Sequence, residues 1–138
     1  MAVKFSVEVR NARLDALETA IGTSAVLKIR SGAAPTNITD ADSGTVLATL
    51  SLPSDWMANA ASGSKSKSGT WQDTSADNTG TAAHFRLYAS DGTTQHMQGS
   101  ITATGGGGDM TVDNTSFVAG QSFTVTAYLL QVFMRKLA

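Results

Sequence analysis

The stretch AHFRLYASDGTTQHMQGSITAT, residues 83–104, decides the fold of this chain because it is typical of a β-hairpin. Apolar and polar residues alternate from Ala83 to Ala89, which is the period of a strand. Asp91-Gly92 is a favoured two-residue hairpin turn, and a second strand is expected over Thr94–Thr104. One face of the first strand carries Phe85, Leu87 and Ala89, and the other carries His84, Arg86 and Tyr88. We therefore expect an antiparallel pair of strands here.

The same alternation, bounded by turns of Gly, Asp, Asn, Ser and Thr, recurs along most of the chain. Further strands are expected at residues 26–30, 46–52, 56–61, from 71, at 110–112 and at 123–132, and residues 62–69 are the most loop-like. No second helical pattern appears that would supply the crossovers of a parallel sheet. The sequence predicts an all-β protein, a jelly-roll-like two-sheet β-sandwich of about eight strands over residues 25–132 with one N-terminal α-helix.

Length and composition narrow the class of protein. The chain has 138 residues, 41% hydrophobic and 15% charged, with a formal net charge of −1 and no cysteine. We expect a single domain over residues 1–138 that folds without disulfides or thiolate metal sites. So weak a net charge speaks against general binding of nucleic acid, and no apolar run approaches the roughly 20 residues of a membrane span. We expect a soluble cytoplasmic product that binds neither nucleic acid nor a membrane.

Residues 6–21 depart from the strand pattern and predict a helix. Ser6 is suited to cap its start, and Gly22 stands where a residue of positive φ commonly ends a helix. Charged residues take the other faces, while four apolar residues fall at helical spacing: Val7, Leu14, Leu17 and Ile21. Two interpretations are open. Either this stripe packs on the sandwich of its own chain, or it docks on a neighbouring subunit.

The end of the chain, residues 131–138, is an apolar tail that follows the last expected strand. The alternation is nearly lost at Leu129, Leu130, Val132, Phe133 and Met134. Because exposed apolar surface costs about 25 cal/mol per Å², some surface is expected to cover this segment. It is either a final strand buried on both faces or an arm that lies on another subunit.

Residues that would support catalysis or hold a metal do not converge. His84 and His96 fall in the two strands of one hairpin, but zinc takes three or four protein ligands and no others stand at suitable spacing. Asp40 and Asp42 lack the distal Glu of a calcium loop, and residues 105–108 lack the Lys-Ser/Thr of a phosphate loop. No nucleophile elbow is present. We expect no enzyme activity, no metal and no cofactor.

Trp56 and Trp71 flank a loop that contains Lys65 and Lys67. Indoles at strand ends of a small sandwich commonly close its core, with the N–H donating to a carbonyl. The alternative is a platform on which sugar rings stack, as in a carbohydrate-binding module that attaches to host glycans. The two lysines belong either to a solvated loop or to a contact with an acidic patch on a partner.

Several segments resemble small virion proteins of tailed bacteriophages: RNARLDALETAIG at 10–22, LKIRSGAAP at 27–35, GTVLATL at 44–50, GTW at 69–71, HFRLY at 84–88 and NTS at 114–116. The chain is most similar to capsid cement (decoration) proteins, of the kind carried by the tropism-switching Bordetella phages. This resemblance implies a jelly roll that dimerises on the outside of an icosahedral shell and clamps major capsid proteins of the HK97 type. The tail, residues 131–138, departs from that pattern.

The residues and the resemblance together favour a virion structural protein, made in the host cytoplasm and bound to the capsid exterior. The expected contact residues are the apolar ones of the helix and tail: Val7, Leu14, Leu17, Ile21, Leu129, Leu130, Val132, Phe133 and Met134. A tail, collar or fibre-adaptor component is the first alternative. A carbohydrate-binding module that uses Trp56 and Trp71 is the second.

Overall fold

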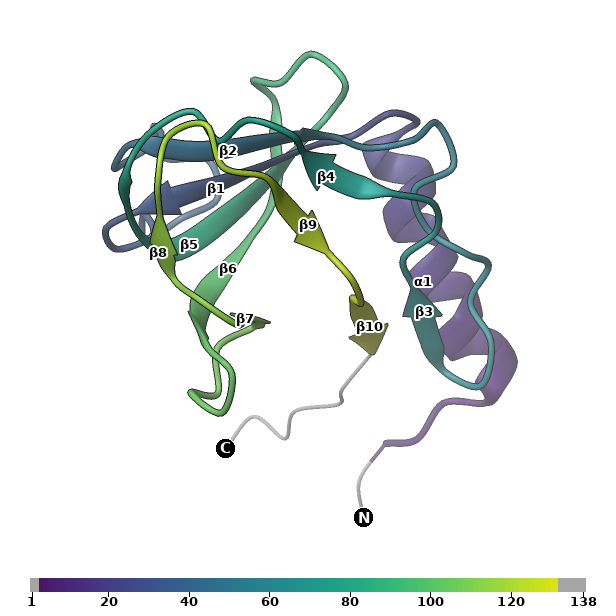
Figure 1. Cartoon of the computed structure of the whole chain (residues 1–138). Coiled ribbons are helices and arrows are strands. Elements are labelled where there is room, and N and C mark those ends of the chain that lie inside the picture. Colours follow the sequence, from purple (N-terminus) through teal and green to yellow (C-terminus); the bar gives the residue numbers. More distant parts are fainter. Residues whose placement is uncertain (1–2, 132–138) are drawn as a thin grey trace.

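A computed structural model describes residues 3–131 of the chain (Figure 1). These residues form one helix and ten strands. In chain order the elements are α1 (Val7–Ile21), β1 (Val26–Ser31), β2 (Val46–Ser51), β3 (Ser64–Ser66), β4 (Trp71–Asp73), β5 (Gly80–Tyr88), β6 (Gln95–Ala103), β7 (Met110–Val112), β8 (Ser116–Phe117), β9 (Phe123–Val125) and β10 (Leu129–Gln131).

The strands form one large sheet and two small ones. The large sheet has the order β2-β1-β5-β6-β7, with β8 on a further part of β5, and the small sheets are β4-β9 and β10-β3. The pair β6-β7 is parallel and the other strand pairs are antiparallel. The β4-β9 pair lies across the core from the large sheet (Figure 1). This confirms an all-β, sandwich-like protein with one helix.

The hairpin of residues 83–104 is present, and β5 and β6 lie inside the sheet. Its loop is longer than predicted, because Ala89 N–H donates to Thr94 O at 3.0 Å and residues 90–93 make the turn. The carboxylate of Asp91 accepts from the N–H groups of Thr93 and Thr94, which holds this wider loop closed. Gly92 has φ +71°, as a left-handed position requires.

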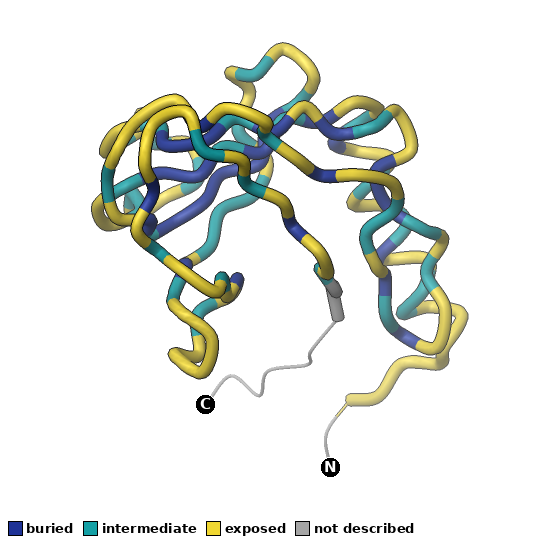
Figure 2. Tube along the Cα trace, in the orientation of Figure 1, coloured by how far each residue is buried: buried dark blue, intermediate teal, exposed yellow. Residues whose placement is uncertain are grey.

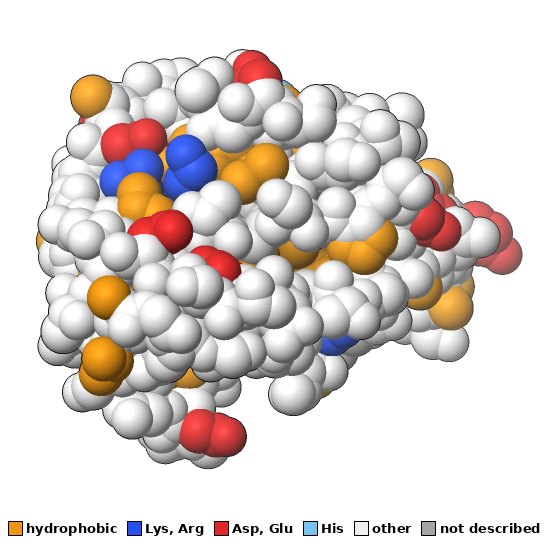
Figure 3. All heavy atoms as spheres, turned by 45° about the horizontal axis from the view of Figure 1, so that its top comes forward, with side chains coloured by type: hydrophobic (Ala, Val, Ile, Leu, Met, Phe, Trp, Pro, Cys, Tyr) orange, Lys and Arg blue, Asp and Glu red, His pale blue; other side chains and the backbone are white. Residues whose placement is uncertain are grey.

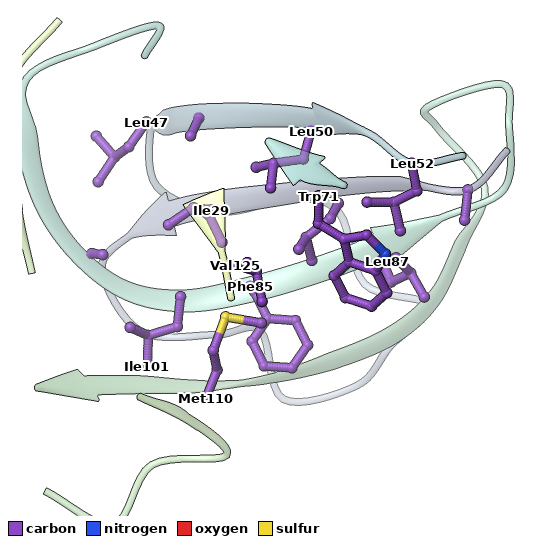
Figure 4. Close-up of a cluster of buried hydrophobic side chains, with 14 of the residues drawn as sticks. Ile29, Leu47, Leu50, Leu52, Trp71, Phe85, Leu87, Ile101, Met110 and Val125 are labelled. Carbon is purple, nitrogen blue, oxygen red and sulfur yellow. The ribbon is translucent and has the colours of Figure 1, made fainter. Parts of the chain in front are cut away.

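The core fills the space between the large sheet and the β4-β9 pair (Figure 4). Ile29, Leu47, Leu50, Phe85 and Leu87 point into it from the large sheet, and each is at most 1% exposed. Trp71 and Val125 meet them from the opposite side. On this face the apolar positions of the sequence pattern are therefore the core positions.

The polar face of β5 is buried too, which the alternating pattern did not indicate. His84, Arg86 and Tyr88 are all at most 1% exposed, so β5 is buried along most of its length (Figure 2). Residues 32–44, which connect β1 to β2, lie over this side and contact these side chains. A strand whose two faces differ in chemistry is thus covered on both, by the core on one side and by a loop on the other.

The helix α1 begins and ends as predicted. Ser6 Oγ accepts from Val9 N–H at 3.3 Å, and Gly22, at φ +91°, donates its N–H to Glu18 O at 2.8 Å. The helix packs against β3 at one side of the molecule (Figure 1).

The segment around β3 corrects two predictions. Residues 56–61 were expected to form a strand but contribute only isolated bridges, Met57 to Lys67 and Ala61 to Ser64. Residues 62–69 were expected to be a loop, yet they contain β3, which pairs with β10. Its polar residues form a strand because the pairing with β10 satisfies its backbone and α1 covers it.

Candidate functional site

One cluster of charged side chains lies under the loop of residues 32–44. Asp42, 32% exposed at its side chain, accepts from Arg30 at 2.9 Å, Arg86 at 2.8 Å and the Tyr88 hydroxyl at 2.7 Å. The Arg86 guanidinium also donates to the carbonyls of Asn37 and Asp40. We call Arg30, Asp42, Arg86 and Tyr88 the loop cluster. It fastens the loop to the sheet. The carboxylate of Asp42 is bound by these three side chains, which is typical of a structural turn and not of a calcium-binding loop.

The loop cluster fixes the charge states around it. Burial alone would raise the pKa of Asp42, but the hydrogen bonds from Tyr88 and Arg86, together with the two arginine charges, hold it below its usual value. Burial lowers the pKa of the neighbouring His84, and the charges of Arg30 and Arg86 lower it further against the hydrogen bond to Gly32. A neutral imidazole therefore sits beside two guanidiniums that share one carboxylate.

The two histidines of the hairpin do not meet. His84 lies opposite Ser100 in the register of β5 and β6, and His96 is exposed near the other end of the hairpin. His84 Nδ1 lies 2.7 Å from the Gly32 carbonyl, so it carries the proton of that bond. Its Nε2 is buried and has no hydrogen-bond partner among the described residues.

Other predicted chemistry finds a structural place. Among residues 3–131, no group of three or more His, Asp or Glu side chains is arranged to hold a metal ion. The glycines at 105–108 lie in the connection from β6 to β7, where Gly108 N–H donates to Thr102 Oγ1 at 2.9 Å. This run closes a tight loop between two parallel strands.

Trp56 and Trp71 are core residues, as the first of the two interpretations predicted, and do not form the alternative glycan platform. Each is 1% exposed, and the two ring centroids lie 6.1 Å apart. Trp56 Nε1 donates to Gly22 O at 2.9 Å, and Trp71 Nε1 donates to Ser68 O at 3.1 Å. Because neither ring face reaches the surface, a sugar has nothing to stack on at this site.

Lys65 belongs neither to a solvated loop nor to a contact with a partner's acidic patch. Its side chain is 1% exposed and its Nζ lies 2.7 Å from Asp15 and 2.8 Å from Glu18, both on α1. The Ala58 carbonyl accepts a third bond at 2.9 Å. Burial would lower the pKa of Lys65, but the hydrogen bonds and charges of the two carboxylates outweigh it and raise that pKa. We call Asp15, Glu18 and Lys65 the helix cluster, because it fastens α1 to β3.

Exposed large apolar side chains gather at the start of the chain. Among the described residues, five of the six lie within residues 3–17: Val3 (65% exposed), Phe5 (38%), Val7 (41%), Val9 (43%) and Leu17 (42%), the sixth being Val118. The described N-terminal segment is correspondingly exposed in Figure 2. We call these five residues the N-terminal apolar surface. Elsewhere the face shown in Figure 3 carries small, separate apolar and charged groups.

This surface matches the predicted contact residues only in part. Val7 and Leu17 are on it, but Leu14 (1% exposed) and Ile21 (9%) are buried against their own domain and are withdrawn as contact residues. Helical spacing placed all four on one stripe, whereas the domain covers the line through Leu14 and Ile21 and leaves uncovered both Leu17, at the side of that line, and Val7, in the first turn. Val3, Phe5 and Val9 were missed, although their alternation with polar residues was a readable signal.

The structure describes only part of the C-terminal segment that was predicted to make contacts. The backbone of Leu129 and Leu130 lies in β10, opposite Ser66 and Lys65 of β3. Val132, Phe133 and Met134 lie outside the described residues.

A cavity of about 240 Å³ lies between β7 and β9. It is lined by residues 110–114 on one side and 121–127 on the other. Within residues 3–131, β7 pairs only with β6 and β9 only with β4, so each strand has one edge without a strand partner. We call this cavity the β7–β9 groove.

Comparison of the chain with protein-family models, with curated proteins and with solved structures finds no match. No helix within the described part of the chain is long and apolar enough to cross a membrane.

Proposed function

We propose that this protein is a structural component of a tailed-bacteriophage virion that binds the outside of an icosahedral capsid. There it cements subunits of a major capsid protein of the HK97 type and pairs with a second copy of itself. The protein is made in the host cytoplasm and acts without catalysis or a cofactor. The jelly-roll connectivity expected from the same resemblance is part of this proposal.

The observation that carries the proposal is the N-terminal apolar surface, which lies outside a body whose own core is closed. The core buries both tryptophans and the apolar face of the large sheet, so these five side chains are not needed to complete it. Several exposed apolar side chains within one short N-terminal segment make that segment the best candidate for a protein contact. The sequence resemblance to cement proteins names the partner.

Cementing also suits weak individual contacts. A shell offers many equivalent sites, and linked copies convert modest affinities into a large total through effective concentration. A small apolar contact per copy, with little net charge to repel neighbouring copies, is then sufficient.

The experiment is binding of the purified protein to phage heads that lack it. We expect it to cosediment with the heads in a number approaching that of shell subunits, and cryo-EM should place it on their outer surface. Leu17→Ser should weaken this binding, whereas Val118→Ser, at an exposed apolar residue far along the chain, should not. A few copies confined to one vertex would instead indicate a tail, collar or fibre-adaptor component, and no binding would refute the proposal.

A further inference from the structure

The first residues of the chain have the pattern of a strand although part of them is helical. In VKFSVEV, residues 3–9, the apolar residues Val3, Phe5, Val7 and Val9 alternate with Lys4, Ser6 and Glu8. In an extended conformation all four apolar side chains would lie on one face. Valine and phenylalanine favour strands, and β-branched residues are poor helix formers.

The start of α1 is held only weakly to the domain. Leu14 is the first buried apolar residue of the helix, and Val7 and Val9, in its first turn, are more than 40% exposed. The carboxylates of the helix cluster, Asp15 and Glu18, also lie beyond this turn. Extending residues 7–9 would therefore break local helical hydrogen bonds and the Ser6 cap, while Leu14, Ile21 and the helix cluster keep the rest of α1 in place.

The β7–β9 groove offers an apolar floor and free strand edges, which could cover the apolar face of such a segment and pair with its backbone. Its floor includes the buried side chains Met110 and Val125, and its rim carries the exposed residues Thr111, Asp113 and Thr124. A strand with one apolar and one polar face would place the first on the floor and the second toward water. The unpaired edges of β7 and β9 would supply main-chain hydrogen bonds, as in β-strand addition.

Charge favours one direction of this pairing. Asp113 on the rim meets no basic side chain among residues 3–131, and Lys4 on the polar side of the segment meets no acidic one. Lys4 and Glu8 stand at opposite ends of the polar face of the segment, so the favoured direction is the one that brings Lys4 and not Glu8 beside Asp113. Such a rim pair would orient the segment more than it would strengthen binding.

The segment of the same molecule is badly placed for its own groove. The helix α1 lies on the outer side of β3, and β3 and β10 stand between it and the groove (Figure 1). If residues 3–9 all lay in this groove, no extended residue would be left to cross both strands from the part of α1 that Leu14, Ile21 and the helix cluster hold in place. A second copy has no such restriction.

From the pattern, exposure and rim charge we propose that residues 3–9 of one copy add as an extended strand to the β7–β9 groove of a second copy. The interaction is independent of the capsid, so the protein would self-associate even if it failed to bind phage heads.

The absence of cysteine in the chain permits a direct test. The Val7→Cys protein is mixed under mild oxidation with Thr124→Cys, in the groove, or with Thr93→Cys, in the distant exposed β5-β6 loop. We expect the 7–124 disulfide, identified by mass spectrometry, to form at least about tenfold faster than the 7–93 disulfide, because docking raises the effective concentration. Equal rates would overturn the proposal.

A second measurement does not depend on cysteine. Sedimentation should show that the unmodified protein self-associates and that Phe5→Lys/Val7→Lys, changed only at exposed side chains, is monomeric with an unchanged circular dichroism spectrum. Val118→Lys is the matched control and should associate like the parent. A parent protein that stays monomeric at every concentration, or a double variant that still associates equally, would refute docking by this segment.

Discussion

The loop cluster and the helix cluster are built from the same kinds of charge in opposite proportion. In the loop cluster two buried cations, Arg30 and Arg86, share the carboxylate of Asp42. In the helix cluster one buried cation, Lys65, is shared by two carboxylates. The first fastens a loop across the middle of the large sheet, and the second fastens a helix at the side of the molecule.

The difference lies in what remains when a cluster is broken. The arginine side chains are at most 6% exposed, so without Asp42 they stay buried with a repulsive excess of charge. The carboxylates of the helix cluster are 45% and 21% exposed, so water can solvate them when Lys65 is lost. The sheet with its loop is therefore the rigid part, and the helix is the part that can loosen or exchange contacts.

The largest effect is expected from Asp42→Asn. Removal of this charge leaves two buried guanidiniums uncompensated, so the free energy of unfolding should fall by about 3 kcal/mol. Chemical denaturation followed by circular dichroism measures it. Asp55→Asn, at an exposed aspartate that has no ion pair or hydrogen-bond partner among residues 3–131, should change stability by less than about 0.5 kcal/mol. Equal losses in the two variants would contradict the role given to the loop cluster.

A smaller loss is expected from Lys65→Met, which keeps the side chain's length but removes its three hydrogen bonds. The two carboxylates can turn to water, so unfolding should become easier by about 1–2 kcal/mol. Hydrogen exchange should quicken in α1 but not in β5. Lys4→Met is the control and should alter neither quantity. Faster exchange throughout the large sheet would show that the helix cluster is not a local fastening.

Acid should act first at His84, which lies beside the loop cluster, and only at lower pH on the carboxylates of the two clusters. Because the folded pKa of His84 is lowered, the unfolded chain binds the proton first, and stability falls as the pH drops below about 6.5. Asp42, also lowered, adds a loss below about pH 4. His84→Asn keeps a donor for Gly32 but does not titrate, so it should flatten the curve between pH 7 and 5. An unchanged slope in that variant would assign the loss to other groups.

The smallest effect on folding is expected from Leu17→Ser, on the uncovered side of α1. This side chain is 42% exposed, so the free energy of unfolding should change by less than about 0.5 kcal/mol. Leu14→Ser, one turn earlier and buried, should cost several times more. Thermal unfolding of the two variants compares them directly, and similar melting temperatures would mean that both faces of the helix are covered.

Elements specified by local signals were predictable, and contacts between distant segments were not. The alternation around Phe85 and Leu87 identified β5 and its core face, and Ser6 and Gly22 identified the ends of α1. Neither pattern could indicate that Asp15 and Glu18 would meet Lys65, since about 50 residues separate them. A Ser/Lys-rich stretch has a loop's composition, and only pairing with β10 makes it a strand.

The candidate site was predictable to the same limited degree. Helical spacing found Val7 and Leu17 but also selected Leu14 and Ile21, because a helical pattern reveals a stripe and not which of its side chains the domain covers. Both tryptophans were recognised as important, but the choice between core and surface required their neighbours.

The sequence by itself determined the strand-rich architecture, the single helix with its caps and the apolar inner face of the hairpin, because periodicity and capping act over a few residues. Only the tertiary structure decided that the polar face of β5 is buried as well, that one lysine is enclosed by two helical carboxylates, and that the apolar start of the chain is left uncovered by its own domain. These outcomes depend on which distant segments cover one another. Whether a residue is buried depends on the distant segments that pack over it, and the residues next to it in the sequence do not specify those segments.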